Sequence, residues 1–217
     1  MRIIQISGKG RVGKTTLAHL IANKSLDLGY IPVIIPFANA IKQLAEKKGL
    51  NKDNGSDAYR DFCQKLGAEK RLEDPEYWVV KAYEEIQSYM IKEIDNKKAN
   101  KDNYEYLVIQ DDVRYMNELA FGRDLVATQI FVNSAGRKLK EHDAEWRTHE
   151  SEVLGNVVEE SLGKSNNEYV ELFDCIIDND GTLEELKKIV DHSIQDWLEL
   201  GYLELEEYND PTDNSNS

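Results

Sequence analysis

The chain has 217 residues, of which 41% are hydrophobic and 31% are charged, and its formal net charge is −14. This length and composition are typical of one globular domain and exclude a disordered or fibrous protein. With 41 acidic residues against 27 basic ones, a broad nucleic-acid-binding face is not expected. A local basic pocket for a phosphorylated small molecule remains compatible with this charge, because the acidity is concentrated after Leu183.

The cysteines and the lengths of the apolar runs indicate the cellular compartment. Cys63 and Cys175 lie far apart, so a disulfide scaffold is excluded and two free thiols in a reducing compartment are expected. The four histidines are scattered and form no metal-ligand cluster. No apolar run approaches the roughly 20 residues of a membrane helix, and the apolar run at the N-terminus is too short for a secretory signal. We expect a cytoplasmic protein without a nucleic-acid or membrane partner.

Short apolar strands alternate with amphipathic helices along the chain. Two proline residues, Pro32 and Pro36, near the ends of the second strand place it at or near a sheet edge. The alternation predicts an α/β fold with a doubly wound, mostly parallel five-stranded sheet in a single domain over 1–207. The strands are expected at 3–6, 31–35, 106–109, 126–132 and 173–177.

Capping residues predict where several helices begin. Ser56 caps a helix with an apolar stripe that includes Tyr59 and Cys63, and Asp74 followed by proline opens a long helix. Thr182 begins a capping box for the last helix, which runs to about residue 200. Further helices are expected over 14–28 and 37–48. Polar loops are expected at 51–56 and 96–103, a lid at 133–150, and a flexible acidic tail at 208–217.

A glycine-rich segment follows the first strand and opens the first helix. It reads Gly8-Lys9-Gly10-Arg11-Val12-Gly13-Lys14-Thr15 and matches the Walker A pattern, in which backbone N–H groups surround a phosphate. Lys14, expected to face solvent, would contact the β- and γ-phosphates of a nucleotide, and Thr15 would bind Mg²⁺. The alternative is a glycine-rich turn that matches by chance. Motif and context together favour a P-loop nucleotide-binding protein.

Two carboxylates and an arginine follow the third strand, as Asp111-Asp112-Val113-Arg114. Open α/β sheets bind ligands at this edge, where a carboxylate can hold Mg²⁺ and an arginine can bind phosphate. An acidic turn with a solvated arginine is the alternative. Beside a P-loop, the functional interpretation is favoured, but the sequence leaves open whether Asp111 or Asp112 serves the metal.

Three polar residues share a helical face if the helix that begins at Ser56 continues through Gly67. Offsets of 4 and 11 residues place Arg60, Gln64 and Arg71 within about 40° of one another at ~100° per residue. They would then face a common pocket, or equally a solvated surface.

The segment after the fourth strand is rich in cations. Such a segment could close over phosphates and stabilise charge during phosphoryl transfer. Acidic residues lie among the cations, so an ordinary mixed-charge loop is an equal alternative. The cations are Arg137, Lys138, Lys140 and Arg147.

An ordered set of motifs resembles the deoxynucleoside monophosphate kinases of tailed phages. The set extends to about residue 190 and is far more specific than the Walker A motif alone. It comprises 8–16, Phe37-Ala38-Asn39-Ala40-Ile41-Lys42, Gln64-Lys65-Leu66-Gly67 with Arg71, Asp74-Pro75-Glu76-Tyr77-Trp78, Asp111-Asp112-Val113-Arg114, His149-Glu150-Ser151-Glu152 and Asn179-Asp180-Gly181-Thr182-Leu183.

The resemblance implies a P-loop NTPase fold with an acceptor-binding region at about 37–95. It also implies ATP with Mg²⁺ as donor and a deoxynucleoside monophosphate as acceptor, in the host cytoplasm if the protein is phage-encoded. Asp112 and Arg114 would serve the metal and phosphates, and Arg137 and Arg147 would belong to the lid. The remaining assignments are Gly8, Lys9, Gly10, Arg11, Val12, Gly13, Lys14, Thr15, Thr16 and Asn179 for the donor, and Arg60, Gln64, Arg71, Trp78 and Arg114 for the acceptor.

One departure keeps a second function class open. Lys9 and the residues after it also resemble the deviant Walker A motif of partitioning ATPases, although Arg11 replaces an expected glycine. Such a switch dimerises, with Lys9 reaching the nucleotide of its partner, so a homodimer is an open prediction. The acidic composition suits its usual DNA or membrane partners poorly. A P-loop kinase for another small phosphorylated acceptor is the third alternative.

Overall fold

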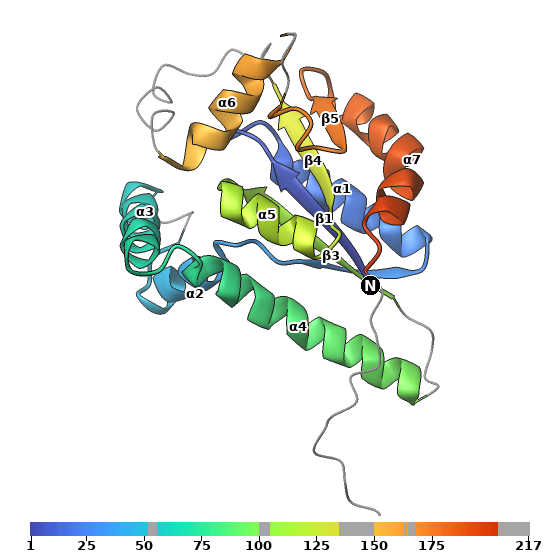
Figure 1. Ribbon diagram of the computed structural model, residues 1–217, viewed down its shortest axis with the longest axis horizontal. Helices are drawn as coiled ribbons and strands as arrows, with labels where there is room; N and C mark the ends of the chain where they lie inside the picture. The colour runs from blue at the N-terminus through green and yellow to red at the C-terminus, as the bar shows by residue number, and fades with distance from the viewer. Residues whose placement is uncertain (52–55, 100–104, 135–149, 163, 165–167, 204–217) are drawn as a thin grey trace, which may run out of the picture.

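The computed structural model describes residues 1–51, 56–99, 105–134, 150–162, 164 and 168–203. Its centre is a five-stranded sheet in the order β2-β3-β1-β4-β5, and every neighbouring pair is parallel (Figure 1). The predicted α/β class and the edge position of the second strand are therefore confirmed. The strands are β1 Arg2–Ser7, β2 Tyr30–Ile34, β3 Glu105–Val113, β4 Thr128–Asn133 and β5 Cys175–Asp178.

Helices cover both faces of the sheet (Figure 1). One face carries α1 (Lys14–Asp27) and α7 (Leu183–Leu200), which pack their apolar stripes on alternate residues of the strands. The opposite face carries α4 (Tyr77–Lys98), α5 (Met116–Asp124) and α6 (Val153–Ser161). The doubly wound arrangement follows, because a parallel sheet must bury both of its faces.

Side chains along β1 point alternately to the two faces of the sheet, which explains why each face has its own hydrophobic core. Ile4 and Ile6 are fully buried against α1 and α7, whereas Ile3 is buried in the cluster that includes Ile86 of α4. Successive side chains of a strand point to opposite faces, so a short apolar run serves two cores.

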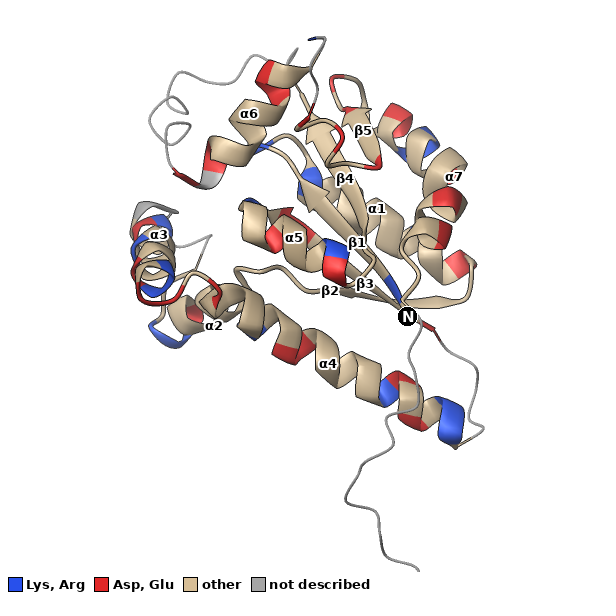
Figure 2. Cartoon of the chain, in the orientation of Figure 1, with Lys and Arg blue, Asp and Glu red and all other residues tan. Residues whose placement is uncertain are grey.

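Two helices lie where the acceptor-binding region was predicted. They are α2 (Asn39–Lys47) and α3 (Ser56–Glu73), and α3 continues through Gly67 without a break. The predicted helix at 37–48 begins two residues later than expected, and the backbone amides of Phe37 and Ala38 just before it donate to the carboxylate of Asp112. Figure 2 shows that α3 carries both acidic and basic side chains.

The long helix α4 also begins later than its capping signal predicted. Asp74 Oδ1 accepts a hydrogen bond of 3.0 Å from the amide of Glu76, and the amide of Tyr77 donates to the Asp74 carbonyl. These contacts close a turn before the helix starts at Tyr77. The last helix follows its prediction, since the Thr182 and Glu185 side chains each bond the backbone of the other.

The structure adds two helices that the sequence patterns did not predict, α5 and α6. Each has nine residues, too short for a clear periodic signal. A three-residue 3₁₀ turn, η3 (Glu150–Glu152), precedes α6. The predicted lid core at 135–149 and the predicted tail at 208–217 lie outside the described residues.

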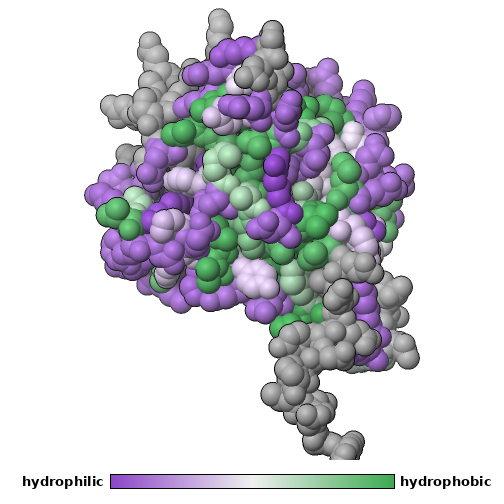
Figure 3. All heavy atoms as spheres, in the orientation of Figure 1, coloured by the Kyte–Doolittle hydropathy of each residue, from purple (hydrophilic) through white to green (hydrophobic). Residues whose placement is uncertain are grey.

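The surface in view is mixed in character. Figure 3 shows hydrophobic side chains in the middle of this face and hydrophilic ones around them. Within the described ranges, no helix is long and apolar enough to cross a membrane.

Candidate functional site

A cavity of about 680 Å³ opens at the carboxyl end of the sheet, beside the N-terminus of α1. Residues from the P-loop form one wall and residues from α2 and α3 form the other, with the end of β3 between them. The lining consists of Gly10, Arg11, Gly13, Lys14, Thr15, Thr16, Ala38, Ile41, Lys42, Tyr59, Arg60, Cys63, Gln64, Arg71, Asp111, Asp112, Arg114, Tyr115 and Glu152.

The backbone of the P-loop requires glycine at its last turn. Gly13 has φ +103°, and a Cβ atom there would lie 2.3 Å from Nδ2 of Asn179. That amide nitrogen donates a 2.8 Å hydrogen bond to the carbonyl of Val12. Asn179 therefore supports the P-loop from behind, and it is not among the residues that line the cavity. Its predicted place near the donor base stays a prediction.

Arg11 takes the position where the sequence departs from an expected glycine. Its φ of 64° lies in the left-handed region, which a residue with a side chain rarely adopts. Backbone strain of this kind costs about 1–3 kcal/mol and is typical of ligand-binding loops. Arg11 thus keeps a backbone conformation that favours glycine. The shape of the loop is retained although the residue type at this position is not the optimal one.

Lys14 is buried, with 7% of its surface exposed, so the prediction that it faces solvent is wrong. Its Nζ donates to the carbonyl oxygens of Gly8, at 2.7 Å, and of Lys9, at 2.6 Å. Burial, with the positive charge of Arg114 acting in the same direction, lowers the pKa of Lys14 to about 7. An anion in the cavity would compensate this burial and favour the charged form.

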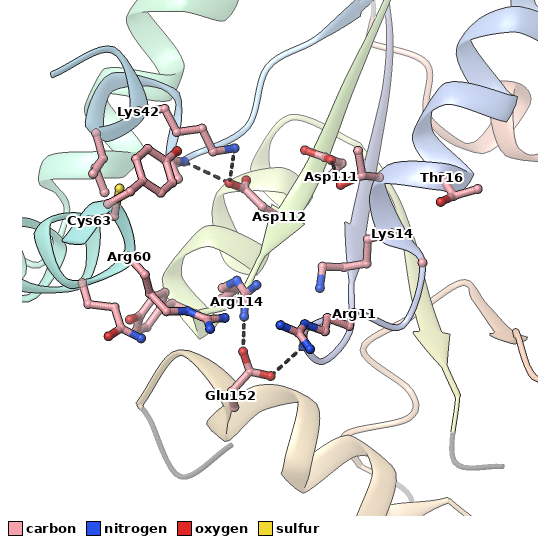
Figure 4. A pocket seen from close by; sticks show the side chains of 18 of the residues that line it. Arg11, Lys14, Thr16, Lys42, Arg60, Cys63, Asp111, Asp112, Arg114 and Glu152 are labelled. Carbon is pink, nitrogen blue, oxygen red and sulfur yellow. Dashed lines mark hydrogen bonds and ion pairs between the residues drawn. The ribbon is translucent and has the colours of Figure 1, made fainter. Parts of the chain in front are cut away.

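The two adjacent carboxylates of β3 point to different parts of the cavity (Figure 4). The register between β1 and β3 shifts, because Ser7 pairs with Val113 while Gln5 pairs with Gln110. One extra residue of β3 is thereby accommodated at Asp111 and Asp112. Bulges of this kind turn side chains toward a site at the end of a strand.

Asp111 faces the P-loop. Thr15 Oγ1 donates to Asp111 Oδ2 at 2.7 Å, and within the described residues Asp111 Oδ1 is buried without a hydrogen-bond partner. A threonine hydroxyl and a carboxylate with one buried, unpaired oxygen form a donor set that suits Mg²⁺. The residues present therefore fit the metal that a P-loop nucleotide site uses.

Asp112 instead faces the wall that α2 and α3 form. Its carboxylate accepts from the backbone amides of Phe37 and Ala38, at 2.7 and 3.2 Å, and lies 3.6 Å from Lys42 Nζ. These contacts occupy both oxygens. The metal role predicted for Asp112 is therefore better placed on Asp111, a choice that the sequence could not make without the bulge.

The face of α3 that was predicted to be polar does line the cavity. Arg60, Gln64 and Arg71 are all brought to it by the unbroken helix. Tyr59 and Cys63, predicted in an apolar stripe directed to the core, line it as well. Burial raises the pKa of the Tyr59 hydroxyl to about 12, with the Cys63 thiol beside it adding to the shift, and burial also raises the pKa of that thiol.

Arg71 is held in place by Tyr115, which directly precedes α5, and by Glu118 in the first turn of α5. Its guanidinium lies 3.8 Å from the centre of the Tyr115 ring, and its Nη2 is 3.5 Å from Glu118 Oε1. The other carboxylate oxygen of Glu118 accepts from the amides of Arg114 and Tyr115. Burial raises the pKa of Glu118 to about 7, although these hydrogen bonds oppose the shift.

Trp78 does not reach the cavity, contrary to its predicted role with the acceptor. The side chain is 2% exposed and its Nε1 donates a 3.1 Å hydrogen bond to the carbonyl of Gly67. Tyr77 packs edge-on against it, with ring centres 4.8 Å apart. Trp78 joins α4 to α3 and so supports, from outside the cavity, the wall that α2 and α3 form. The surrounding sequence does not distinguish a tryptophan buried in the core from one that stacks on a ligand.

The last wall residue, Glu152, and α6 contact the P-loop. Glu152 pairs with Arg114 (Figure 4), and it also accepts a 2.8 Å hydrogen bond from the amide of Gly10. Lys9 pairs with Glu159 of α6. Gly8, Lys9 and Val12, predicted to contact the donor, are not among the lining residues. The predicted lid cations Arg137, Lys138, Lys140 and Arg147 lie outside the described residues.

Comparisons with known proteins give structural neighbours only. The sequence matches no protein-family model and no curated protein. A shikimate kinase from Aquifex aeolicus is 14% identical, with a TM-score of 0.38 over 89% of this chain and 96% of that one. A shikimate kinase from Acinetobacter baumannii, in complex with shikimate, is 12% identical, with a TM-score of 0.39 over 90% and 94%. Similarity at this level does not identify an acceptor for this chain.

Proposed function

We propose that the protein is a deoxynucleoside monophosphate kinase, which transfers the γ-phosphoryl group of ATP to a deoxynucleoside monophosphate. The products are a deoxynucleoside diphosphate and ADP. The observation that carries the proposal is the arrangement of one cavity, with a P-loop on one wall and Arg60, Gln64 and Arg71 on the other. Such a cavity suits two phosphorylated ligands that meet end to end. The motif resemblance supports the nucleotide acceptor.

The donor wall binds and orients the triphosphate. Backbone N–H groups of the P-loop and the N-terminus of α1 favour negative charge there, and Lys14 lies among them. Thr15 and Asp111 would hold Mg²⁺, which neutralises charge on the β- and γ-phosphates when bound. Asp111 is prepared for this role because one of its oxygens is buried and unpaired among the described residues.

The wall that α2 and α3 form, called the acceptor wall here, positions the monophosphate. Arg71 is fixed by Tyr115 and Glu118, so its guanidinium is already oriented when the acceptor binds. Preorganisation of this kind lowers the entropic cost of binding. Arg114 lies between the walls, where it would stabilise charge on the phosphoryl group in transit. Positioning and charge stabilisation suffice for phosphoryl transfer, and no covalent intermediate is required.

The partitioning-type switch receives no support from the position of Lys9. A lysine that acts on the nucleotide of a partner must project from its own chain, whereas Lys9 pairs with Glu159 of the same chain. A kinase for another phosphorylated acceptor would have the same P-loop and a different second wall. The acceptor wall is therefore the part of the proposal that needs a direct test.

The experiment measures ADP release from ATP and Mg²⁺ with a panel of acceptors. The panel contains the deoxy- and ribonucleoside monophosphates, together with phosphorylated sugars and shikimate as non-nucleotide controls. Turnover that requires a deoxynucleoside monophosphate and is at least about tenfold faster than with the controls, a barrier difference of ~1.4 kcal/mol, is expected. Turnover with a non-nucleotide acceptor, and with none of the nucleoside monophosphates, would contradict the proposed acceptor class.

A further inference from the structure

The contact between Glu152 and the P-loop joins two parts of the site that are far apart in sequence. Glu152 is 3% exposed, and its two carboxylate oxygens have different partners. One accepts the 2.8 Å hydrogen bond from the amide of Gly10, and the other pairs with Nη1 of Arg114. The carboxylate is therefore a bridge between the P-loop backbone and the arginine that lies between the donor and acceptor walls.

The segment that carries Glu152 is itself fixed on the P-loop. Lys9 pairs with Glu159 of α6, about two helical turns beyond Glu152. A Cβ atom at Gly155 would lie 2.8 Å from Cγ of Lys9 and 3.2 Å from its backbone nitrogen, so glycine is required for this close approach. The Lys9–Glu159 pair and the close approach of Gly155 to Lys9 therefore fix the position of Glu152 relative to Gly10.

We propose that Glu152 is a positioning residue, which holds the Arg114 guanidinium at a fixed place relative to the P-loop. This inference rests on the proposed kinase function. A guanidinium has five N–H donors, and the pair with Glu152 uses only Nη1, so the remaining donors can serve a phosphate. Without its carboxylate partner the long side chain of Arg114 would lose this orientation, since free rotamers compete with the bound one.

The chemistry of the bridge requires a carboxylate. Both partners of Glu152 are donors, so each of its oxygens must accept. Glutamine at this position offers one accepting oxygen and one NH₂ group, and it can keep only one of the two bonds. Glu152→Gln therefore tests the bridge while preserving the volume of the buried side chain. Glu160→Gln is the matched control, because Glu160 is exposed on α6 and the charge change is the same.

A double-mutant cycle tests whether Glu152 acts through Arg114. The variants are Glu152→Gln, Arg114→Ala and the combination, and both the Kd for ATP with Mg²⁺ and the turnover with the best acceptor are measured. Each single variant is expected to weaken ATP binding by about tenfold and to lower kcat by at least as much. The double variant should be no worse than the more affected single variant, and Glu160→Gln should match the wild type.

Two results would overturn the inference. Additive losses in the double variant would show that Glu152 acts independently of Arg114, and tighter ATP binding in Glu152→Gln would show that the carboxylate merely blocks the phosphate site. Thermal melting of each variant identifies unfolding, and in that case Arg114→Lys replaces Arg114→Ala in the cycle. If the wild type phosphorylates no acceptor, the proposed function fails, whereas the cycle in ATP affinity still decides the role of Glu152.

Discussion

Thr15 and Asp111 are 96 residues apart in the sequence and joined by a 2.7 Å hydrogen bond from the threonine hydroxyl to the carboxylate. The bond links the first turn of α1 to the end of β3, so the P-loop and the carboxylate form one donor set. Asp112, the next residue, is engaged with backbone amides on the other side of the cavity. The two aspartates therefore make separate sets of contacts, and we expect their roles to be separable.

Asp111→Asn should impair metal-dependent catalysis, whereas Asp112→Asn should mainly impair acceptor use. Loss of a charged ligand at the metal site is expected to lower kcat by about 100-fold, or ~2.7 kcal/mol of barrier, and to raise the Mg²⁺ concentration needed for half-maximal rate. Asp112→Asn should raise the acceptor KM and leave the Mg²⁺ requirement near that of the wild type. A Mg²⁺ titration of both variants separates them. The opposite pattern would return the metal role to Asp112.

Arg71→Ala should weaken acceptor binding more than ATP binding. The guanidinium is oriented by the Tyr115 ring and by Glu118, and it belongs to the acceptor wall. A charge-assisted contact to phosphate is worth roughly 1.5–3 kcal/mol, so the acceptor KM should rise about 10- to 150-fold. Steady-state kinetics with each substrate varied in turn provide the check. A higher KM for ATP with an unchanged acceptor KM would mean that the two walls are exchanged.

Lys9→Ala should cause only a modest loss, within about tenfold of wild-type turnover or ~1.4 kcal/mol of barrier. Lys9 contacts Glu159 rather than the cavity, and Lys14 supplies the principal charge at the phosphates. The oligomeric state, measured by light scattering, should not change on addition of ATP. ATP hydrolysis without any acceptor, lost together with ATP-induced dimerisation in Lys9→Ala, would identify a partitioning-type switch.

Glu118 makes the stability of the protein depend on pH in a predictable direction. Burial raises its pKa from 4.5 to about 7 in the folded protein, so between these values the folded state keeps a proton that the unfolded chain has lost. The free energy of unfolding should therefore fall as pH rises through this window, by up to about 1.4 kcal/mol per pH unit. Glu118→Gln carries no such proton, and its stability relative to the wild type should increase from pH 4.5 to 7.

Urea denaturation of both proteins at several pH values measures this difference. Glu160→Gln, an exposed change of the same charge on α6, serves as the control and should follow the wild type. A constant difference between Glu118→Gln and the wild type across the window would show that Glu118 titrates normally.

Local patterns predicted the elements that lie on either side of the P-loop. The strand–glycine–helix order around Gly13 and the capping box at Thr182 are encoded by neighbouring residues, which is why both could be read from the sequence. The helical face of Arg60, Gln64 and Arg71 also follows from spacing alone, once α3 is known to pass Gly67 unbroken.

What the sequence could not reveal depends on contacts between distant segments. The bulge that separates Asp111 from Asp112 arises from the pairing of β3 with β1, and no local signal reports it. Trp78 was assigned to the acceptor through the family resemblance. Its hydrogen bond to the carbonyl of Gly67 instead holds it between α4 and α3, and no local pattern reports this contact. Glu152 acquires its partners only when α6 packs on the P-loop.

Transfer of labelled phosphate tests the central claim most directly. The protein is incubated with Mg²⁺, ATP labelled at the γ-phosphate and each deoxynucleoside monophosphate in turn, and the products are separated. The account predicts label in a deoxynucleoside diphosphate, formed only when the acceptor is present and abolished in Lys14→Ala. Label released only as inorganic phosphate, at a rate that does not depend on any deoxynucleoside monophosphate, would contradict it.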